Sequence, residues 1–230
     1  YKPGFAIRWG LSIYVKTNHW SMMFDTGPDP NALAHNMLKL GLNSKELDFI
    51  VISHDHGDHA GGLPFIAKEK RDLSVYIPDS KGLAMYISKL KLHPVIIREA
   101  SSLNNGIYST GSLGRFLVEQ AVIIRIKKLG GILLVGCSHP GIENIALHAH
   151  KILGDSIFLI IGGFHLTYIS SSQLKKIINI FDRIGVQKVF PIHCTGSKAR
   201  YTLSMALKEK YGEGGVGLTI HVDSNGITVM

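Results

Sequence analysis

A short cluster of potential metal ligands constrains this chain of 230 residues more than any other part of its sequence. Four such side chains lie within six positions: His54, His56, Asp58 and His59. They follow the apolar run 49–52, whose length and β-branched content predict a buried strand. Imidazole and carboxylate groups are the ligands that zinc and similar borderline cations prefer. The spacing favours two adjacent metal ions over one closed tetrahedral site.

The alternative is a polar loop that contains histidines by chance, and the density of metal-binding groups disfavours it. Three histidines and two aspartates fall within positions 54–59. The pattern H-x-H-x-D-H, followed by Ala60 and two glycines, resembles the signature of the metallo-β-lactamase superfamily. The resemblance implies an α/β fold of four layers, an αββα sandwich in which helices cover two central sheets.

The order of predicted elements fits the same sandwich. The expected strands cover 5–8, 11–15, 21–24, 49–52, 74–77, 94–98, 116–127, 132–135, 157–161 and 186–192. The expected helices cover 31–40 with Asn31 as the cap, 63–68, 81–91, 142–153, 170–185 and 197–211. No linker or low-complexity segment interrupts this order, so residues 1–230 are expected to form a single domain.

One long segment lacks any regular pattern. Residues 99–115 are rich in Ser, Asn and Gly. An aperiodic stretch of this length is more often functional than idle, so we expect a loop that borders the active site. The tail after the last expected helix is predicted to close the fold as a hairpin.

Three further histidines, His139, His165 and His193, stand where a predicted strand ends. A single histidine in such a place is usually a structural hydrogen-bonding group. Three of them, each at the carboxyl end of a strand where α/β folds form their sites, favour metal binding for His139 and His193.

The superfamily resemblance implies how these residues share two metal ions. It assigns His54, His56 and His139 to one ion, and Asp58, His59 and His193 to the other. Asp25, which follows a predicted strand, matches a residue that accepts a ring N–H from a metal-bound histidine. The implied cofactor is zinc, as two ions, with manganese or iron as alternatives.

The chain departs from the superfamily pattern where most members carry an aspartate that bridges the two ions. Here Gly163-Phe164-His165 holds that place, and no carboxylate replaces the aspartate. His165 either coordinates in its stead or hydrogen-bonds the substrate, so both His165 and Asp58 are candidate catalytic residues. Without the bridge the second ion should be held more loosely, and an enzyme with one ion is the alternative.

Both cysteines of the chain adjoin predicted metal ligands. Cys137 lies two residues before His139, and Cys194 follows His193 directly. Free cysteines are often plain core residues, which favours a structural role. The alternative is a thiolate ligand to the second ion.

Three further motifs resemble one branch of the superfamily. They are Cys-Ser-His-Pro-Gly-Ile-Glu-Asn-Ile at 137–145, Gly-Gly-Phe-His-Leu at 162–166 and Pro-Ile-His-Cys-Thr-Gly at 191–196, and Glu119-Gln120 is similar too. The branch contains 7,8-dihydropterin-6-methyl-4-(β-D-ribofuranosyl)aminobenzene-5′-phosphate synthases and metal-dependent hydrolases. The resemblance extends from about Gly10 to Gly196.

The branch resemblance implies a metal-dependent enzyme. We expect a hydrolase that uses a metal-activated water on a small, phosphorylated substrate. The alternative at the same site is the synthase reaction, in which the metal ions would bind a pyrophosphate leaving group. A nuclease of the ribonuclease Z type and a structural metal-binding protein are less favoured, because the chain lacks an Arg/Lys-rich arm and its ligands are not cysteine-rich.

A helix start near the last motif is a candidate seat for the phosphate group. Helix N-termini bind anions through their free N–H groups. The residues predicted to form this seat are Thr195, Gly196, Ser197, Lys198 and Arg200. The alternative is an ordinary helix cap exposed to solvent.

The composition supports a small anionic partner. The net charge of +8 favours anionic ligands or nucleic acid, and the absence of an obvious RNA-gripping segment disfavours nucleic acid. Two cysteines give no disulfide framework, which favours a cytoplasmic protein. No apolar run approaches the ~20 residues that span a membrane, and no signal peptide is visible, so we expect no membrane partner. The sequence does not predict an oligomeric state.

Overall fold

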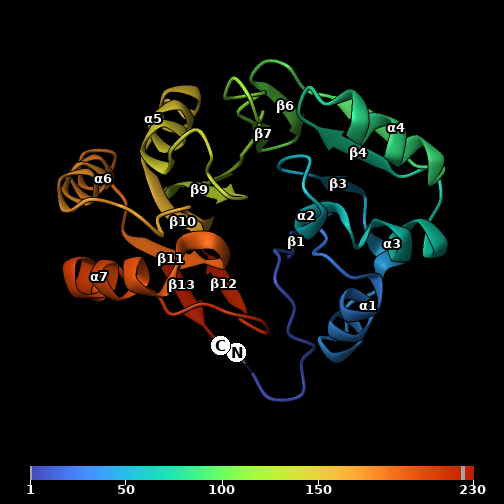
Figure 1. Cartoon of the computed structure of the whole chain (residues 1–230), viewed down its shortest axis with the longest axis horizontal. Coiled ribbons are helices and arrows are strands. Elements are labelled where there is room, and N and C mark those ends of the chain that lie inside the picture. Colours follow the sequence, from blue (N-terminus) through green and yellow to red (C-terminus); the bar gives the residue numbers. More distant parts are fainter. Residues whose placement is uncertain (1, 224–225) are drawn as a thin grey trace.

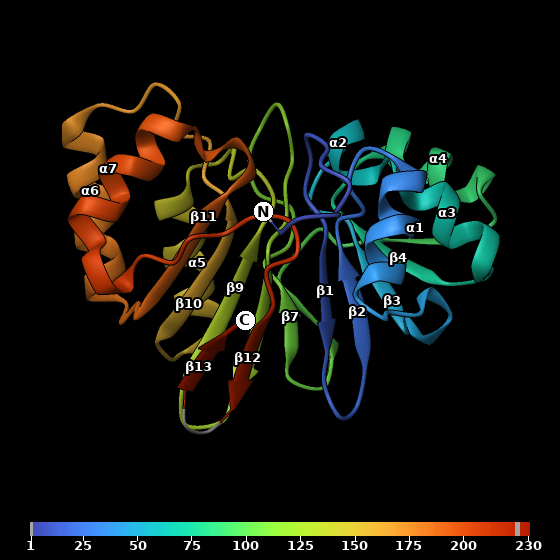
Figure 2. The same cartoon turned by 90° about the horizontal axis from the view of Figure 1, so that it is seen from below.

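Two β-sheets pack face to face at the centre of the molecule, and helices cover the outer face of each sheet (Figures 1 and 2). The computed structural model describes residues 2–223 and 226–230. In that part of the chain the two sheets hold five and six strands, and a separate two-stranded hairpin follows them. The predicted four-layer αββα sandwich is confirmed.

The first sheet comes from the N-terminal half, in the order β1-β2-β3-β4-β5. Its strands are β1 (Ile13–Lys16), β2 (Ser21–Phe24), β3 (Phe49–Val51), β4 (Ser74–Ile77) and β5 (His93–Ile96). β1 and β2 form an antiparallel hairpin, whereas the pairs from β2 to β5 are parallel. Its outer face is covered by α1 (Pro30–Lys39), α3 (Leu63–Glu69) and α4 (Lys81–Lys89), which bury their apolar sides against it.

The second sheet has the order β11-β10-β9-β8-β7-β6. Its strands are β6 (Ser101–Asn104), β7 (Ile107–Ser109), β8 (Val122–Ile126), β9 (Gly130–Val135), β10 (Ile157–Gly163) and β11 (Lys188–Ile192). β9, β10 and β11 run parallel, and the other pairs are antiparallel. Its outer face is covered by α5 (Ile142–Leu153), α6 (Ser171–Arg183) and α7 (Ser197–Leu207). Across the described residues, none of the helices has the length and apolarity needed to cross a membrane.

The inner faces of the two sheets share one apolar core. It includes Met22, Phe24, Val51, Leu134, Ile161 and Phe190, all buried. β10 is buried along its whole length, because helices cover one of its faces and the first sheet covers the other. The tail forms the predicted hairpin from β12 (Ile220–Asp223) and β13 (Gly226–Val229), and its turn at 224–225 lies outside the described residues.

Shortly after several strands, a non-glycine residue adopts a left-handed backbone conformation. These residues are Asp25 after β2, Ser138 after β9, His165 after β10 and His193 after β11, with φ between 51° and 62°. Such conformations cost roughly 1–3 kcal/mol each and persist where the surrounding structure fixes them, often at functional sites. The strained residues therefore indicate a functional site at the carboxyl edge of the sheets.

The strand predicted at 5–8 is wrong, because the segment has no regular structure. The backbone of this segment forms hydrogen bonds with the side chain of Asn36 in α1 instead of with a neighbouring strand. The Ala6 N–H donates to Oδ1 of Asn36 at 2.8 Å, and Nδ2 of Asn36 donates to the Ala6 carbonyl at 2.9 Å. The predicted cap of α1 also differs, since Asp29 rather than Asn31 accepts the first N–H groups of the helix.

The loop predicted at 99–115 contains a hairpin formed by β6 and β7. Gly106 takes a φ of 73° in its turn. β6 is a polar strand at the edge of the sheet, so it lacks the apolar alternation from which a strand is predicted. Conversely, the strand predicted at 116–127 is regular only in β8, and the chain before it is irregular. The helix predicted at 197–211 ends at Leu207 and continues as a 3₁₀ turn.

Candidate metal centre

The histidine-rich segment follows β3 at the carboxyl edge of the first sheet. His54 is buried, and its backbone forms an isolated antiparallel β-bridge with Glu119 from the C-terminal half of the chain. The chain then enters the one-turn helix α2 (Gly57–Ala60), for which His56 is the N-cap residue. Asp58 and His59 lie in this turn, and Oδ2 of Asp58 approaches Nε2 of His59 to 3.7 Å. The strand end and the short helix together gather the four side chains.

Three histidines are placed so that they could hold one metal ion, and we call them the first ligand set: His54, His56 and His139. One ring nitrogen of each lies within 4.8 Å of those of the other two. Nε2 of His54 and Nδ1 of His56 are 3.0 Å apart. Burial, and then the neighbouring His59 ring, lower the pKa of His54. The ring is therefore neutral at neutral pH and offers a lone pair, as a metal ligand must.

A second group has the same spacing and could hold another metal ion; we call it the second ligand set, and it consists of Asp58, His59 and His193. Oδ2 of Asp58 lies 3.3 Å from Nε2 of His193. Both ring nitrogens of His193 are buried and have no hydrogen-bond partner within the described part of the chain. A buried nitrogen without a partner is costly, and a metal ion would remove that cost. Burial and the nearby His59 lower the pKa of His193 to about 4, so the set fits a metal ion.

Asp25 fixes the ring of His59. Its Oδ2 lies 2.6 Å from Nδ1 of His59, and the carboxylate also accepts the N–H of Ser53 at 2.7 Å and its hydroxyl at 2.8 Å. All of these groups are buried. Although burial opposes the charge, Asp25 raises the pKa of His59. The contact with the Asp25 carboxylate places a proton on Nδ1, and Nε2 faces the second ligand set.

Glu119 fixes the ring of His139 in the same way that Asp25 fixes the ring of His59. Its carboxylate accepts Nδ1–H of His139 at 2.9 Å and the backbone N–H groups of Cys137, Ser138 and His139 at 2.8–2.9 Å. Burial opposes its charge, but the hydrogen bonds from His139 and Ser138 hold the pKa of Glu119 below its usual range. Each ligand set thus contains one histidine that a buried carboxylate orients. The sequence pointed to Glu119 only through the branch resemblance and gave it no role.

His165 and the two cysteines lie beside these sets. The ring of His165 is 4.9 Å from that of His139 between centroids. Sγ of Cys137 is 3.3 Å from Nε2 of His59, and it also lies within ligand spacing of His54. Contact with Cys194 and burial raise the pKa of Cys137, whereas the same contact lowers the pKa of Cys194 to about 6. The two sulfur atoms lie within 4.8 Å of each other.

Contacts inside the protein already engage two of the five residues that were predicted to bind an anion. Thr195 is buried, donates its hydroxyl to the Ile192 carbonyl at 2.7 Å and accepts the Phe164 N–H at 3.1 Å. Arg200 pairs with Glu213 and donates to the Gly214 carbonyl. Gly196, together with the exposed Ser197 and Lys198, remains at the start of α7. The prediction of an anion seat therefore narrows to these three residues.

The N-terminal segment lies over the second ligand set. The sequence did not predict this position. The ring of Trp9 is 5.1 Å from that of His193 between centroids, and the indole is 68% exposed. Leu11 donates its N–H to the Asp58 carbonyl at 3.1 Å. A Cβ at Gly10 would come within 2.4 Å of that same oxygen, so this close approach requires glycine. Because the segment has no periodic pattern, only the fold reveals its position.

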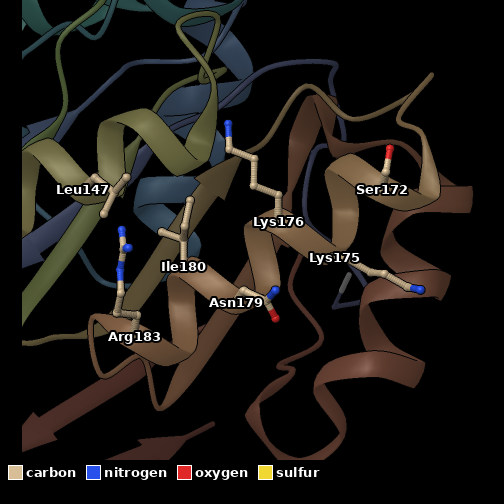
Figure 3. A pocket seen from close by; sticks show the side chains of 7 residues that line it. All are labelled: Leu147, Ser172, Lys175, Lys176, Asn179, Ile180 and Arg183. Carbon is tan, nitrogen blue, oxygen red and sulfur yellow. The ribbon is translucent and has the colours of Figure 1, made fainter.

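Two hollows on the surface differ in their relation to the centre. The larger lies between α5 and α6 and contains none of the clustered histidines (Figure 3). Its amino groups at Lys175 and Lys176 point in different directions, and Lys176 pairs with Glu143. The smaller, about 280 Å³, is lined by His165, Tyr168 and neighbouring residues. Of these two hollows, the smaller one therefore adjoins the candidate metal centre.

Comparisons with known proteins agree with the motifs. Residues 10–101 match the family described as the metallo-β-lactamase superfamily. The chain is 27% identical to the 7,8-dihydropterin-6-methyl-4-(β-D-ribofuranosyl)-aminobenzene-5′-phosphate synthase of Methanocaldococcus jannaschii, over 92% of this chain and 89% of that protein. The fold matches the crystal structure of Tm1679, a metal-dependent hydrolase of the β-lactamase superfamily, with a TM-score of 0.81 and 25% identity over 97% and 95% of the two chains.

A third similarity is more limited. The chain is 33% identical to ribonuclease Z of Nanoarchaeum equitans over 86 residues. The match covers 35% of this chain and 26% of that protein. The likeness to this nuclease is therefore confined to a part of each molecule.

Proposed function

Since the chain belongs to the metallo-β-lactamase superfamily, we propose that it is a metal-dependent hydrolase that acts on a small, phosphorylated substrate through a metal-activated water. The two ligand sets carry this proposal. They lie side by side, and each contains a histidine oriented by a buried carboxylate, Asp25 or Glu119. The proposed cofactor is two zinc ions, with manganese or iron as alternatives.

Metal ions bound in such sets polarise the electrophilic centre of a substrate and supply a hydroxide nucleophile near neutral pH. The protein contributes the positions of the donors. Asp25 and Glu119 keep the ring protons of His59 and His139 on Nδ1, so that the opposite nitrogens remain free. His165 is exposed beside His139, where it can hydrogen-bond the substrate or donate a proton to the leaving group.

Three observations support a phosphorylated substrate. The net charge of +8 attracts anions. Ser197 and Lys198 are exposed at the start of α7, four and five residues after His193. The name of the synthase relative contains a 5′-phosphate group, which supports an anionic substrate for this chain as well. Lys198 is the residue we expect to contact the phosphate.

A turnover screen on metal-loaded protein tests the hydrolase proposal. The panel contains phosphomonoesters, phosphodiesters, thioesters and lactones. We expect hydrolysis of a phosphate ester, its loss in His56→Ala and a raised KM in Lys198→Ala. His148→Ala is a matched control, since His148 lies on α5 and its Nε2 contacts the Thr110 carbonyl instead of either ligand set. Hydrolysis of lactones or thioesters alone, unchanged by Lys198→Ala, would refute the phosphate assignment.

A second candidate is the synthase reaction, and the 27% identity over most of both chains favours it. The same ligand sets would then hold metal ions that bind a pyrophosphate leaving group. The test supplies a dihydropterin pyrophosphate together with a ribofuranosylaminobenzene phosphate. Release of pyrophosphate that requires both compounds would establish the synthase, and release from the first compound alone would indicate a hydrolase.

A further inference from the structure

Cys137, His165 and Cys194 form a further group of metal donors, and the proposed hydrolysis gives no role to its two cysteines. Both sulfur atoms and one ring nitrogen lie within 4.8 Å of one another. We propose that this cysteine–histidine cluster binds a thiophilic metal ion through two sulfur atoms and one nitrogen atom. The site is additional to the two ligand sets and does not depend on which reaction they support.

The topology of the second sheet brings the three residues together. β9, β10 and β11 are adjacent and parallel, with Gly162 opposite Val135 and Gly163 opposite Ile192. Each residue of the cluster stands two positions after the last residue of one of these strands. Because the carboxyl ends of parallel strands meet at one edge of a sheet, this placement brings the three residues together at that edge.

A glycine leaves the room that the cluster needs. A Cβ at position 163 would come within 2.6 Å of Sγ of Cys194 and within 2.6 Å of the Gly136 carbonyl oxygen. The sulfur of Cys194 therefore occupies space that any other residue at 163 would fill. From there it also approaches the carbonyl oxygen of Cys137 to 3.6 Å.

The surroundings of the sulfur atoms differ from those of a plain core cysteine. Cys137 and Cys194 are only 4% and 8% exposed. Their neighbours nevertheless include polar groups, since Sγ of Cys137 lies 3.3 Å from Nε2 of His59 and Cys194 contacts His165. His165 is exposed and lines the hollow of about 280 Å³, which gives an ion a path from solvent.

The donor types define the class of metal. Two thiolates and an imidazole select soft or borderline ions such as zinc, cadmium or copper(I), whereas manganese and magnesium prefer oxygen donors. Structural zinc sites are closed by four protein ligands. The cluster offers three, so the bound ion would keep one position for water or another ligand. The soft sulfur donors of the cluster therefore give it a different metal preference from that of the ligand sets, which consist of histidine and aspartate.

Cobalt(II) provides the direct test, because thiolate-bound cobalt absorbs strongly in the near ultraviolet. The chain has two cysteines, so any sulfur-to-cobalt band must arise from Cys137 or Cys194. We expect the band to grow as metal-free protein is titrated with cobalt, and to fall in Cys137→Ser, in Cys194→Ser and in His165→Ala. His148→Ala is the control and should keep the full band.

Three outcomes would overturn the proposal. The first is protein saturated with cobalt, by elemental analysis, that shows no sulfur band. The second is a band that disappears in Cys137→Ser but is unchanged in Cys194→Ser and His165→Ala, which would assign Cys137 to the histidine sets alone. The third needs no variant: X-ray absorption of the wild-type protein with one equivalent of cadmium should detect two sulfur neighbours, and finding none contradicts the cluster.

Discussion

Nδ1 of His139 donates to the carboxylate of Glu119 at 2.9 Å, and the same carboxylate holds the backbone of residues 137–139 through three N–H groups. The contact between His59 and Asp25, at 2.6 Å, repeats this arrangement in the second ligand set. One buried carboxylate thus supports each set, and the two come from different halves of the chain. These contacts make the metal affinity of each set separately testable.

Glu119→Gln should weaken metal binding at the first ligand set by about 10–100-fold, the usual effect of removing an acceptor behind a metal-bound histidine. Chelator competition on the metal-loaded protein measures the change. Glu143→Gln is the matched control, since Glu143 is also buried but pairs with Lys176 on α6. Equal affinities in the Glu119 variant and the wild type would show that the contact does not serve metal binding.

Glu119 should also make the stability of the metal-free protein depend on pH. Its pKa is lower in the folded protein than in the unfolded chain, despite burial, because of hydrogen bonds from His139 and Ser138. Its contribution is therefore present above the unfolded pKa of about 4.3 and is lost as the pH falls through the folded pKa. Urea unfolding should show Glu119→Gln less stable than the wild type at neutral pH, with the two converging below about pH 4. A difference that stays constant with pH would contradict this assignment.

Trp9 should report metal binding at the second ligand set. Its ring lies 5.1 Å from His193, whereas Trp20, the other tryptophan of the chain, is buried in the core between the sheets. Paramagnetic cobalt(II) should therefore quench the emission of Trp9. We expect the loss of fluorescence to disappear in Trp9→Phe and in His193→Ala and to persist in Trp20→Phe. Quenching that survives Trp9→Phe would place the responsive ion elsewhere.

Three residues of the two ligand sets were predicted from sequence because each stands just after an apolar run that forms a strand. They are His54, His139 and His193, and the structure brings each into the set expected for it. The four-layer fold followed from the same alternation of strands and helices. Local pattern predicted which segments carry the donors, whereas the division of the donors into two sets came from the superfamily resemblance.

Residues placed by long-range contacts could not be predicted in this way. Glu119 lies in an irregular segment and reaches His139 only because β8 and β9 pair. Trp9 reaches His193 from a segment without periodicity. Ala6 has its backbone hydrogen bonds satisfied by Asn36, a side chain of α1, which no strand pattern can reveal. These contacts depend on the assembled fold.

The two ligand sets should differ in how strongly they hold metal. His165 stands where the superfamily pattern has a bridging aspartate, so the second set depends on Asp58 for its negative charge. Manganese separates these sets from the cysteine–histidine cluster, because it binds thiolates poorly. We expect two equivalents of manganese at saturation, with one lost first during dialysis against chelator. His193→Ala should retain the slowly released equivalent and lose the other, while His148→Ala should keep both. Release of both equivalents from the wild type in a single phase would show that the missing carboxylate does not weaken the second set.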